Sequence, residues 1–168
     1  MVHLEHKKSS SKIRAKVALL CISDSQTPDT DRSGRIIKAI LESKRHLISR
    51  HTIVKNNEKS ISDAIGDVVM RQDVDAVVTI GGTGLSRKDM TIDVVSKFYE
   101  KELKGFGELF RYLSFRKIGS SAMMSRASAG LVKGKMIFSI PGSPSAVELA
   151  SEALIAPELS HIISEVSK

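Results

Sequence analysis

Short apolar runs and stretches with helical spacing alternate along this chain. An uninterrupted apolar run is typical of a strand that is buried on both faces of a parallel sheet. Between these runs, hydrophobic residues recur every three or four positions, which predicts amphipathic helices. The predicted strands are 16–23, 47–54, 76–80, 127–132 and 135–140, and the last two form a hairpin with a tight turn at Gly134.

Helix starts are marked by local signals. Ser33 is the expected N-cap of the first helix, and Ser143 followed by Pro144 is a strong start signal after the last strand. Strands that alternate with helices predict the α/β class, with a mostly parallel sheet and helices on both faces. The predicted helical segments are 33–41, 61–69, 91–99, 106–115, 144–154 and 157–166, with a short turn at 120–125.

Composition narrows the function. The net charge of +7 favours an anionic partner: nucleic acid, acidic lipid or a phosphorylated small molecule. Nucleic acid is the least favoured, because Trp is absent and aromatic residues make up only 4%, which argues against base stacking. No apolar run approaches the roughly 20 residues of a membrane span and no signal peptide is apparent, so a cytoplasmic protein without membrane contact is predicted.

Polar and basic residues fill the start of the chain, so residues 1–14 are predicted to form a flexible arm ahead of a single domain, 15–168. Cys21, the only cysteine, lies in the first apolar run and is predicted to be a buried small hydrophobe. Because there is a single cysteine, an internal disulfide and a cysteine-based zinc site are both expected to be excluded.

A glycine loop follows the strand 76–80. Three glycines within residues 81–84 (GGTG) and a charged cluster at 87–89 (RKD) lead into the next helix. Glycines at the end of a buried strand let a ligand approach bare backbone N–H groups, which suits an anion. A tight turn with solvated charges is the alternative. The loop matches neither the Walker pattern nor GxGxxG, because Ser86 and Arg87 stand where those motifs need glycine.

Ligands of parallel sheets bind outside the carboxyl ends of the strands. Three loops are expected to meet there: Ser23-Asp24, 81–89 and 141–145. Acids beside a phosphate repel it unless a cation lies between them, and Mg²⁺ resolves that conflict. Asp89, inside the glycine loop, is the best candidate ligand; a helix-start acid is the alternative, for it and for Asp93. The residues alone thus predict magnesium-assisted chemistry on a nucleotide or phosphorylated small molecule.

Four segments resemble a known family: TIGGTGLSRKDMTID (79–93), GFGELFRYLSFRKIG (105–119), SRASAG (125–130) and IPGSPSAV (140–147). From about Lys16 onward the chain is similar to molybdenum cofactor biosynthesis proteins of the molybdopterin adenylyltransferase type, in particular the branch called protein B. The resemblance implies a three-layer α/β/α fold, a molybdopterin-binding-type domain over 15–168, and a homo-oligomer, trimer or hexamer. It also implies a reaction in which the terminal phosphate of molybdopterin attacks the α-phosphorus of ATP, with Mg²⁺, releasing pyrophosphate.

Site residues follow from the same resemblance. Asp89 matches the family's essential aspartate, which makes it the implied catalytic residue and metal ligand. Ser23 and Asp24 match a Ser-Asp pair near the nucleotide. The residues that match pterin-binding and other pocket segments are Gly81, Gly82, Thr83, Gly84, Ser125, Arg126, Gly142 and Ser143.

One position departs from the family. After the second strand, where an aspartate important for catalysis is usual, this chain has Asn56. An amide can coordinate a metal or form hydrogen bonds, but it carries no charge and cannot act as a base near neutral pH. Two functions are therefore predicted: adenylylation of molybdopterin with Asp89 and Asn56 in the catalytic site, or, as the alternative, non-catalytic binding or carriage of molybdopterin in the same pathway.

Overall fold

The computed structural model describes residues 13–168. Of the predicted arm, residues 1–12 lie outside the described part. The last two arm residues contact the domain: the Ile13 carbonyl accepts a hydrogen bond from Ser160 Oγ (2.9 Å), and Arg14 Nε donates to the Arg45 carbonyl (3.0 Å).

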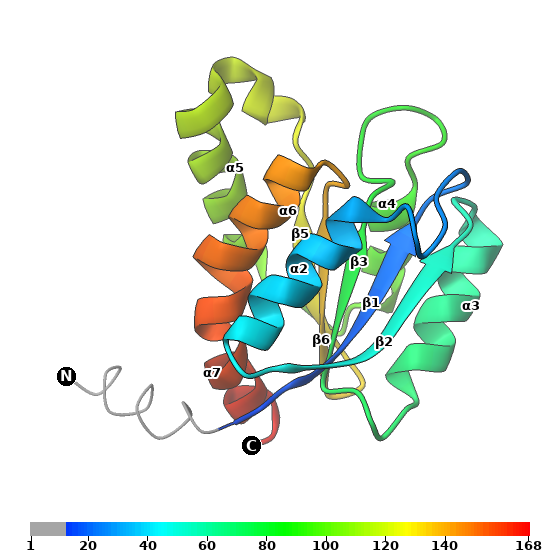
Figure 1. Ribbon diagram of the computed structural model, residues 1–168, viewed down its shortest axis with the longest axis vertical. Helices are drawn as coiled ribbons and strands as arrows, with labels where there is room; N and C mark the ends of the chain where they lie inside the picture. The colour runs from blue at the N-terminus through cyan, green and yellow to red at the C-terminus, as the bar shows by residue number, and fades with distance from the viewer. Residues whose placement is uncertain (1–12) are drawn as a thin grey trace.

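A six-stranded sheet runs through the middle of the molecule, in the order β2-β1-β3-β6-β5-β4 (Figure 1). Strands β2, β1, β3 and β6 are parallel, whereas β5 is antiparallel to both of its neighbours. The predicted α/β class, with a mostly parallel sheet and a late hairpin, is confirmed. The strands are β1 (Lys16–Ile22), β2 (Leu47–Val54), β3 (Ala76–Ile80), β4 (Lys101–Glu102), β5 (Ser128–Val132) and β6 (Lys135–Ile140).

Helices cover both faces of the sheet and give three layers (Figure 1). One face carries α2, α5, α6 and α7, and the other carries α3 and α4. The helices are α2 (Arg32–Ser43), α3 (Glu58–Val69), α4 (Thr91–Val95), α5 (Lys104–Ile118), α6 (Pro144–Ala150) and α7 (Ala156–Val166). Two 3₁₀ turns, η1 (Ser96–Phe98) and η2 (Gly119–Met124), and a π-helical turn, η3 (Ser151–Ile155), complete the order.

Strand β1 shows why this sequence builds two cores. Its side chains alternate, so Val17 and Leu19 pack beneath α2 and α5–α7, whereas Ala18 and Leu20 pack beneath α3. All four are at most 3% exposed. Burying each of the larger side chains contributes roughly 1.5–3 kcal/mol, so a strand apolar on both faces stabilises both layers.

Three local features differ from the sequence prediction. Asp31, not Ser33, caps α2, because its carboxylate accepts a hydrogen bond from the Gly34 N–H (2.8 Å). The short strand β4 consists of two exposed charged residues and has no hydrophobic signal. Helices α6 and α7 are continuous through the π-turn, where the wider spacing accommodates Pro157, which lacks an N–H. Within residues 13–168, no helix has the length and apolar character needed to cross a bilayer.

Candidate functional site

Two glycines turn the chain sharply after β3. Gly81 and Gly82 have φ values of +96° and +63°, which L side chains rarely adopt. Space is also lacking: a Cβ on Gly82 would lie 2.4 Å from Thr91 Oγ1, and one on Gly81 would lie 2.8 Å from the Ile22 carbonyl oxygen. Both positions therefore require glycine, and the turn passes directly over the end of β1.

Thr91, the first residue of α4, holds this turn in place. Its buried hydroxyl donates to the Gly81 carbonyl (2.8 Å), and its backbone N–H donates to the Gly82 carbonyl (2.9 Å). Both carbonyl groups of the turn are thus paired inside the protein. The start of the glycine loop is therefore fixed by the helix that follows it.

The loops after β3 and β6 meet over the carboxyl ends of the strands, as predicted. Gly142 lies against Gly81, since a Cβ on Gly142 would be 3.1 Å from the Gly81 Cα. Between these loops and the end of η2 lies a pocket of about 310 Å³. It is lined by Gly81, Gly82, Thr83, Gly84, Asp89, Met124, Ser125, Arg126, Pro141 and Gly142.

Arg126 joins the η2 side of the pocket to the glycine loop. One guanidinium nitrogen, Nη1, donates to the Gly84 carbonyl (3.2 Å), and the other, Nη2, donates to Asp93 Oδ1 (2.7 Å). These two bonds hold a planar cation on the pocket wall, a group well suited to phosphate oxygens. Asp93, a possible helix-start acid in the sequence, thus pairs with Arg126 from the first turn of α4.

Asp89 folds back onto its own loop. Its Oδ2 accepts a hydrogen bond from the Ser86 N–H (3.2 Å), and a Cβ on Gly84 would lie 2.6 Å from the same oxygen. Gly84 therefore gives the carboxylate its place on the pocket wall.

Asn56 lies beneath the glycine loop. Its backbone N–H donates to Asp24 Oδ1 (3.0 Å), which ties the end of β2 to the loop after β1. Its side-chain Oδ1 is buried, and no group within residues 13–168 donates a hydrogen bond to it. That oxygen would be 3.0 Å from a Cβ on Gly82. A buried unpaired oxygen costs roughly 1–3 kcal/mol, so a donor or cation brought by a ligand would relieve that cost.

Four predicted residues do not line the pocket wall. Asp24 and Asn56 form a pair at its β1–β2 side. Ser23 uses its hydroxyl to accept hydrogen bonds from the backbone of Ser25 (3.2 Å) and Gln26 (3.1 Å), which shapes the loop after β1. Ser143 precedes α6 without capping it through its side chain. These four residues lie in the loops around the pocket and are not part of its lining.

The helix N-termini contribute less to anion binding than the sequence predicted. Helices α4 and α6 do begin beside the pocket, but α4 has only five residues and therefore a small dipole. Helix α6 starts with Pro144, which has no N–H to offer a ligand. The backbone of the glycine loop and the Arg126 guanidinium are therefore the main groups for an anion.

The residues present fit a hard cation such as Mg²⁺. Such ions prefer oxygen ligands and are usually held by one or two carboxylates together with phosphate oxygens. Asp89 supplies one such carboxylate on the pocket wall, whereas the unpaired Oδ1 of Asn56 lies beneath the loop and outside the lining.

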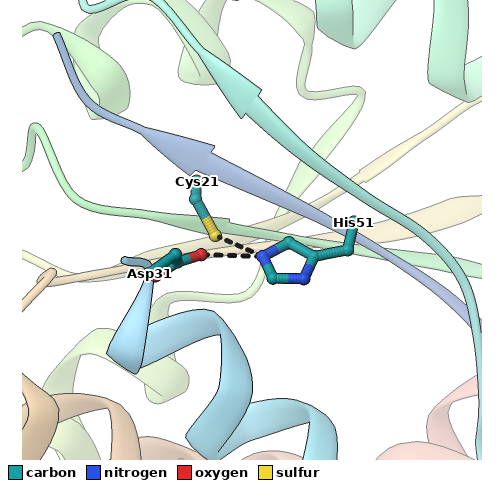
Figure 2. Close-up of side chains that lie close together, drawn as sticks. All are labelled: Cys21, Asp31 and His51. Atoms are coloured by element: carbon teal, nitrogen blue, oxygen red, sulfur yellow. Dashed lines mark hydrogen bonds and ion pairs between the residues drawn. The ribbon is translucent and has the colours of Figure 1, made fainter. Parts of the chain in front are cut away.

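A second polar cluster lies under the start of α2 (Figure 2). His51 Nε2, from β2, is 2.7 Å from Asp31 Oδ2 and 3.5 Å from Cys21 Sγ of β1. Burial raises the pKa of the Cys21 thiol, and the adjacent Asp31 carboxylate raises it further. Burial also works to raise the pKa of Asp31, but hydrogen bonds from Cys21, Gly34 and His51 outweigh it and hold that pKa below its usual value.

Another cavity, of about 350 Å³, lies between the hairpin side of the sheet and α7. Its walls include Leu103, Leu131, Met136, Ile162 and Val166. Lys101, Glu102, His161 and Glu165 also line this cavity, but its wall is mainly apolar, and no residue predicted for the site is among them.

Sequence reasoning missed two supports of the pocket. Thr91 carried a signal, because it is a hydroxyl residue at a predicted helix start. Ser33 does not act as the predicted N-cap. It lies inside α2, and its Oγ donates to the Gly142 carbonyl (2.7 Å), which is 109 positions further along the chain. Met124 and Pro141 complete the wall and carried no chemical signal of their own.

The class of this three-layer α/β protein follows from the comparison with protein families. The family model described as "Probable molybdopterin binding domain" matches residues 18–161.

The curated relatives narrow the class. Molybdenum cofactor biosynthesis protein B of Bacillus anthracis is 46% identical over 166 residues, covering 98% of this chain and 97% of that protein. A crystal structure of a molybdenum cofactor biosynthesis protein B has a TM-score of 0.90 at 44% identity, covering 92% of this chain and 97% of that one. The tungsten cofactor synthesizing protein MoaB from Pyrococcus furiosus has a TM-score of 0.83 at 32% identity, covering 92% and 98%. The chain belongs to the molybdenum cofactor biosynthesis protein B family.

Proposed function

We propose that this protein acts in molybdenum cofactor biosynthesis by transferring an adenylyl group from ATP to molybdopterin. The observation that supports this most is that one pocket gathers the glycine loop, Asp89, Arg126 and Gly142 from segments far apart in the sequence. The terminal phosphate of molybdopterin attacks the α-phosphorus of ATP, a new P–O–P bond forms, and pyrophosphate leaves.

The residues of the pocket suit this transfer. Three of the four residues from Gly81 to Gly84 are glycines without side chains, so phosphates can come within contact of the main chain. Arg126, oriented by the Gly84 carbonyl and Asp93, supplies fixed positive charge where negative charge accumulates on the transferring phosphoryl group. Neither group needs to reorganise during the reaction.

The proposal includes Mg²⁺, held by Asp89 and substrate phosphates. When bound, the ion neutralises phosphate charge and polarises the phosphorus that is attacked. Among the residues that line the pocket, Asp89 is the one that carries a carboxylate.

The test measures pyrophosphate release with ATP, Mg²⁺ and molybdopterin. We expect release only when molybdopterin is present, and a fall of about 10²–10³-fold in Asp89→Asn, comparable to the loss of a major electrostatic group. Asp63→Asn, a surface acid paired with Lys59, is the matched control and should retain full rate. An unchanged rate in folded Asp89→Asn would refute the assignment.

Asn56 favours a second candidate, a non-catalytic molybdopterin-binding or carrier protein. A neutral amide leaves the pocket one carboxylate short of the family's usual pair. Under this alternative, molybdopterin binds tightly without pyrophosphate release, and Asn56→Asp does not restore it. Turnover gained in Asn56→Asp would instead show that the pocket supports adenylylation and that the amide is what suppresses it.

We further propose that the protein is a homo-oligomer, trimer or hexamer. Large apolar side chains are exposed along α5 and η2, although ordinary monomers rarely expose contiguous apolar surface. On α5 they recur at three-residue intervals, so each is a surface neighbour of the next and together they form a stripe that winds around the helix. The exposed residues are Leu109, Tyr112, Phe115, Ile118, Met123 and Met124.

Sedimentation velocity tests the oligomer. Phe115, 58% exposed in this chain, should be covered by a neighbouring copy, so Phe115→Asp is expected to yield monomers. Met70→Asp, at the end of α3 on the opposite face of the sheet, introduces the same charge at a 62% exposed site and should leave the oligomer intact. A wild-type protein that sediments as a monomer would contradict the proposal.

A further inference from the structure

We propose that Cys21, Asp31 and His51 form a binding site for a borderline-soft divalent metal ion, of which Zn²⁺ is the best fit. The site is distinct from the pocket and from the proposed magnesium position. Its three ligands come from β1, from the N-cap of α2 and from β2 (Figure 2).

The geometry is close to that of a metal centre. The thiol sulfur, one carboxylate oxygen and one imidazole nitrogen all lie within 4.8 Å of one another. Tetrahedral zinc with its usual bond lengths separates S, N and O ligand atoms by about 3.4–3.6 Å. Cys21 Sγ and His51 Nε2 already lie 3.5 Å apart, and the 2.7 Å between His51 Nε2 and Asp31 Oδ2 needs to open by less than about 1 Å.

The three ligand atoms converge on one point. His51 Nε2 faces both Cys21 Sγ and Asp31 Oδ2, and the Cys21 thiol also hydrogen-bonds to the Asp31 carboxylate. A cation at the common point contacts all three atoms. Asp31 can bind it through Oδ2 while Oδ1 keeps its bond to the Gly34 N–H, so the cap of α2 survives.

Charge balance favours a divalent ion. On binding, the Cys21 thiol loses its proton to solvent and becomes a thiolate, and His51 keeps its remaining ring proton on Nδ1. Thiolate and carboxylate together carry two negative charges, which cancel the two positive charges of the ion. No redox change is involved. A neutral cluster avoids the large cost of burying an uncompensated charge.

The site is enclosed but has an opening. Asp31 and Cys21 are buried, whereas the His51 side chain is 20% exposed and borders solvent. Gly34 makes room for the ligands, because a Cβ there would lie 2.2 Å from Asp31 Oδ2 and 2.4 Å from His51 Nε2. A bound ion would tie β1, β2 and α2 together, and the fourth position of a tetrahedral ion would be filled by water from the exposed side of His51.

Cobalt is the probe that tests this site. Co²⁺ added to the metal-free full-length protein should give the intense ultraviolet band of thiolate-to-cobalt charge transfer and visible bands of tetrahedral cobalt, and Zn²⁺ should abolish both. Cys21 is the only cysteine, so the charge-transfer band reports this site alone. His3 and His6 lack a thiolate and cannot produce it. Zn²⁺ should also raise the temperature of unfolding.

Matched variants separate the site from other metal binding. Cys21→Ser should remove the band, and Asp31→Asn should weaken Co²⁺ binding by at least about tenfold, since even indirect supports of metal sites are worth about 10–100-fold. Asp29→Asn removes a neighbouring acid outside the cluster and should change nothing. The proposal is overturned if the folded wild type shows no thiolate band with excess Co²⁺, or if Asp31→Asn binds Co²⁺ as well as the wild type. Neither outcome bears on pyrophosphate release, so this test is independent of the proposed function.

Discussion

The loops at the two ends of the parallel strands are arranged differently. At the amino end, the loops are tied to one another: the Lys16 N–H donates to Asp75 Oδ2 (2.7 Å), the Ala15 N–H donates to His46 Nδ1 (3.2 Å), and Lys135 Nζ donates to the Val74 carbonyl (2.6 Å). At the carboxyl end, the loops after β3 and β6 meet, but a pocket of about 310 Å³ stays open between them and the end of η2.

This difference separates stability from ligand binding. Side chains at the amino end form hydrogen bonds with the backbone of neighbouring segments, so the end is closed. At the carboxyl end, supports such as Thr91 and Ser33 lie behind the pocket, and Asp89 and Arg126 stay on its wall. Changes at the amino end should therefore affect stability alone, and changes at the carboxyl end should affect binding as well.

Gly82→Ala should have the largest effect, and it should lower both the stability of the protein and its affinity for molybdopterin. The alanine must adopt a φ of +63°, and its Cβ would lie 2.4 Å from Thr91 Oγ1. We expect a loss of about 2–4 kcal/mol in the free energy of unfolding, and a loss of molybdopterin affinity of about 100-fold or more, because the loop is displaced. Urea unfolding and equilibrium binding measure the two.

Gly119→Ala is the control for that change. Gly119 has nearly the same φ, +65°, but nothing lies within 4 Å of a Cβ placed on it. Its ψ of −146° places it in a region that is almost exclusive to glycine, so the alanine reports backbone strain without the clash, at a cost of about 1–3 kcal/mol and with affinity unchanged. Equal effects of the two alanines would mean that strain alone, and not the contact with Thr91, makes Gly82 necessary.

His46→Ala tests the amino end. His46 is only 3% exposed, and its replacement leaves a cavity and an unpaired N–H on Ala15. The free energy of unfolding should fall by about 2–4 kcal/mol in urea titrations. Molybdopterin affinity, measured well below the unfolding midpoint, should stay within about twofold of the wild type. Lys44→Ala, an exposed neighbour, should change stability by less than about 0.5 kcal/mol. A drop in affinity would show that the two ends are coupled.

Thr91→Val removes one hydroxyl from beneath the glycine loop. Valine keeps the shape, but the Gly81 carbonyl loses its donor at 2.8 Å. We expect the loop conformation that binds the ligand to be destabilised by about 1 kcal/mol, which corresponds to a loss of affinity of roughly fivefold. Thr91→Ser retains the hydroxyl and should bind as the wild type does. If valine and serine behave alike, this hydrogen bond does not set the loop geometry.

Periodicity and turn signals predicted the fold because they report local burial. The apolar run of β3 and the glycines that follow it placed the pocket at the correct edge of the sheet. Contacts between distant segments carry no such signal. The hydrogen bond from Ser33 to Gly142, and the meeting of Cys21 with His51, depend on how elements pack side by side. In the sequence, Asp31 is only one of several acids in a loop, and nothing there indicates its contact with His51.

The two ends of the sheet should lose stability in separate pH ranges when the protein is titrated with acid. Burial, only partly opposed by a hydrogen bond to the Ala156 backbone, lowers the pKa of His46 below its ordinary value of 6.5. Below pH 6.5 the unfolded chain therefore binds a proton that the folded chain does not, and stability falls with decreasing pH until the folded histidine is also protonated. One proton limits the slope to about 1.4 kcal/mol per pH unit.

Asp31, at the carboxyl end, titrates later. Its folded pKa lies below 3.8, so the stabilisation from its carboxylate is complete above that pH and is lost as the pH falls through the lower, folded value. Urea unfolding from about pH 8 to about pH 2 measures both windows. His46→Gln should flatten only the upper window and Asp31→Asn only the lower one. If the free energy of unfolding of His46→Gln still falls with pH just below pH 6.5, another group causes that fall. The two ends of the sheet would then not be distinguished by pH.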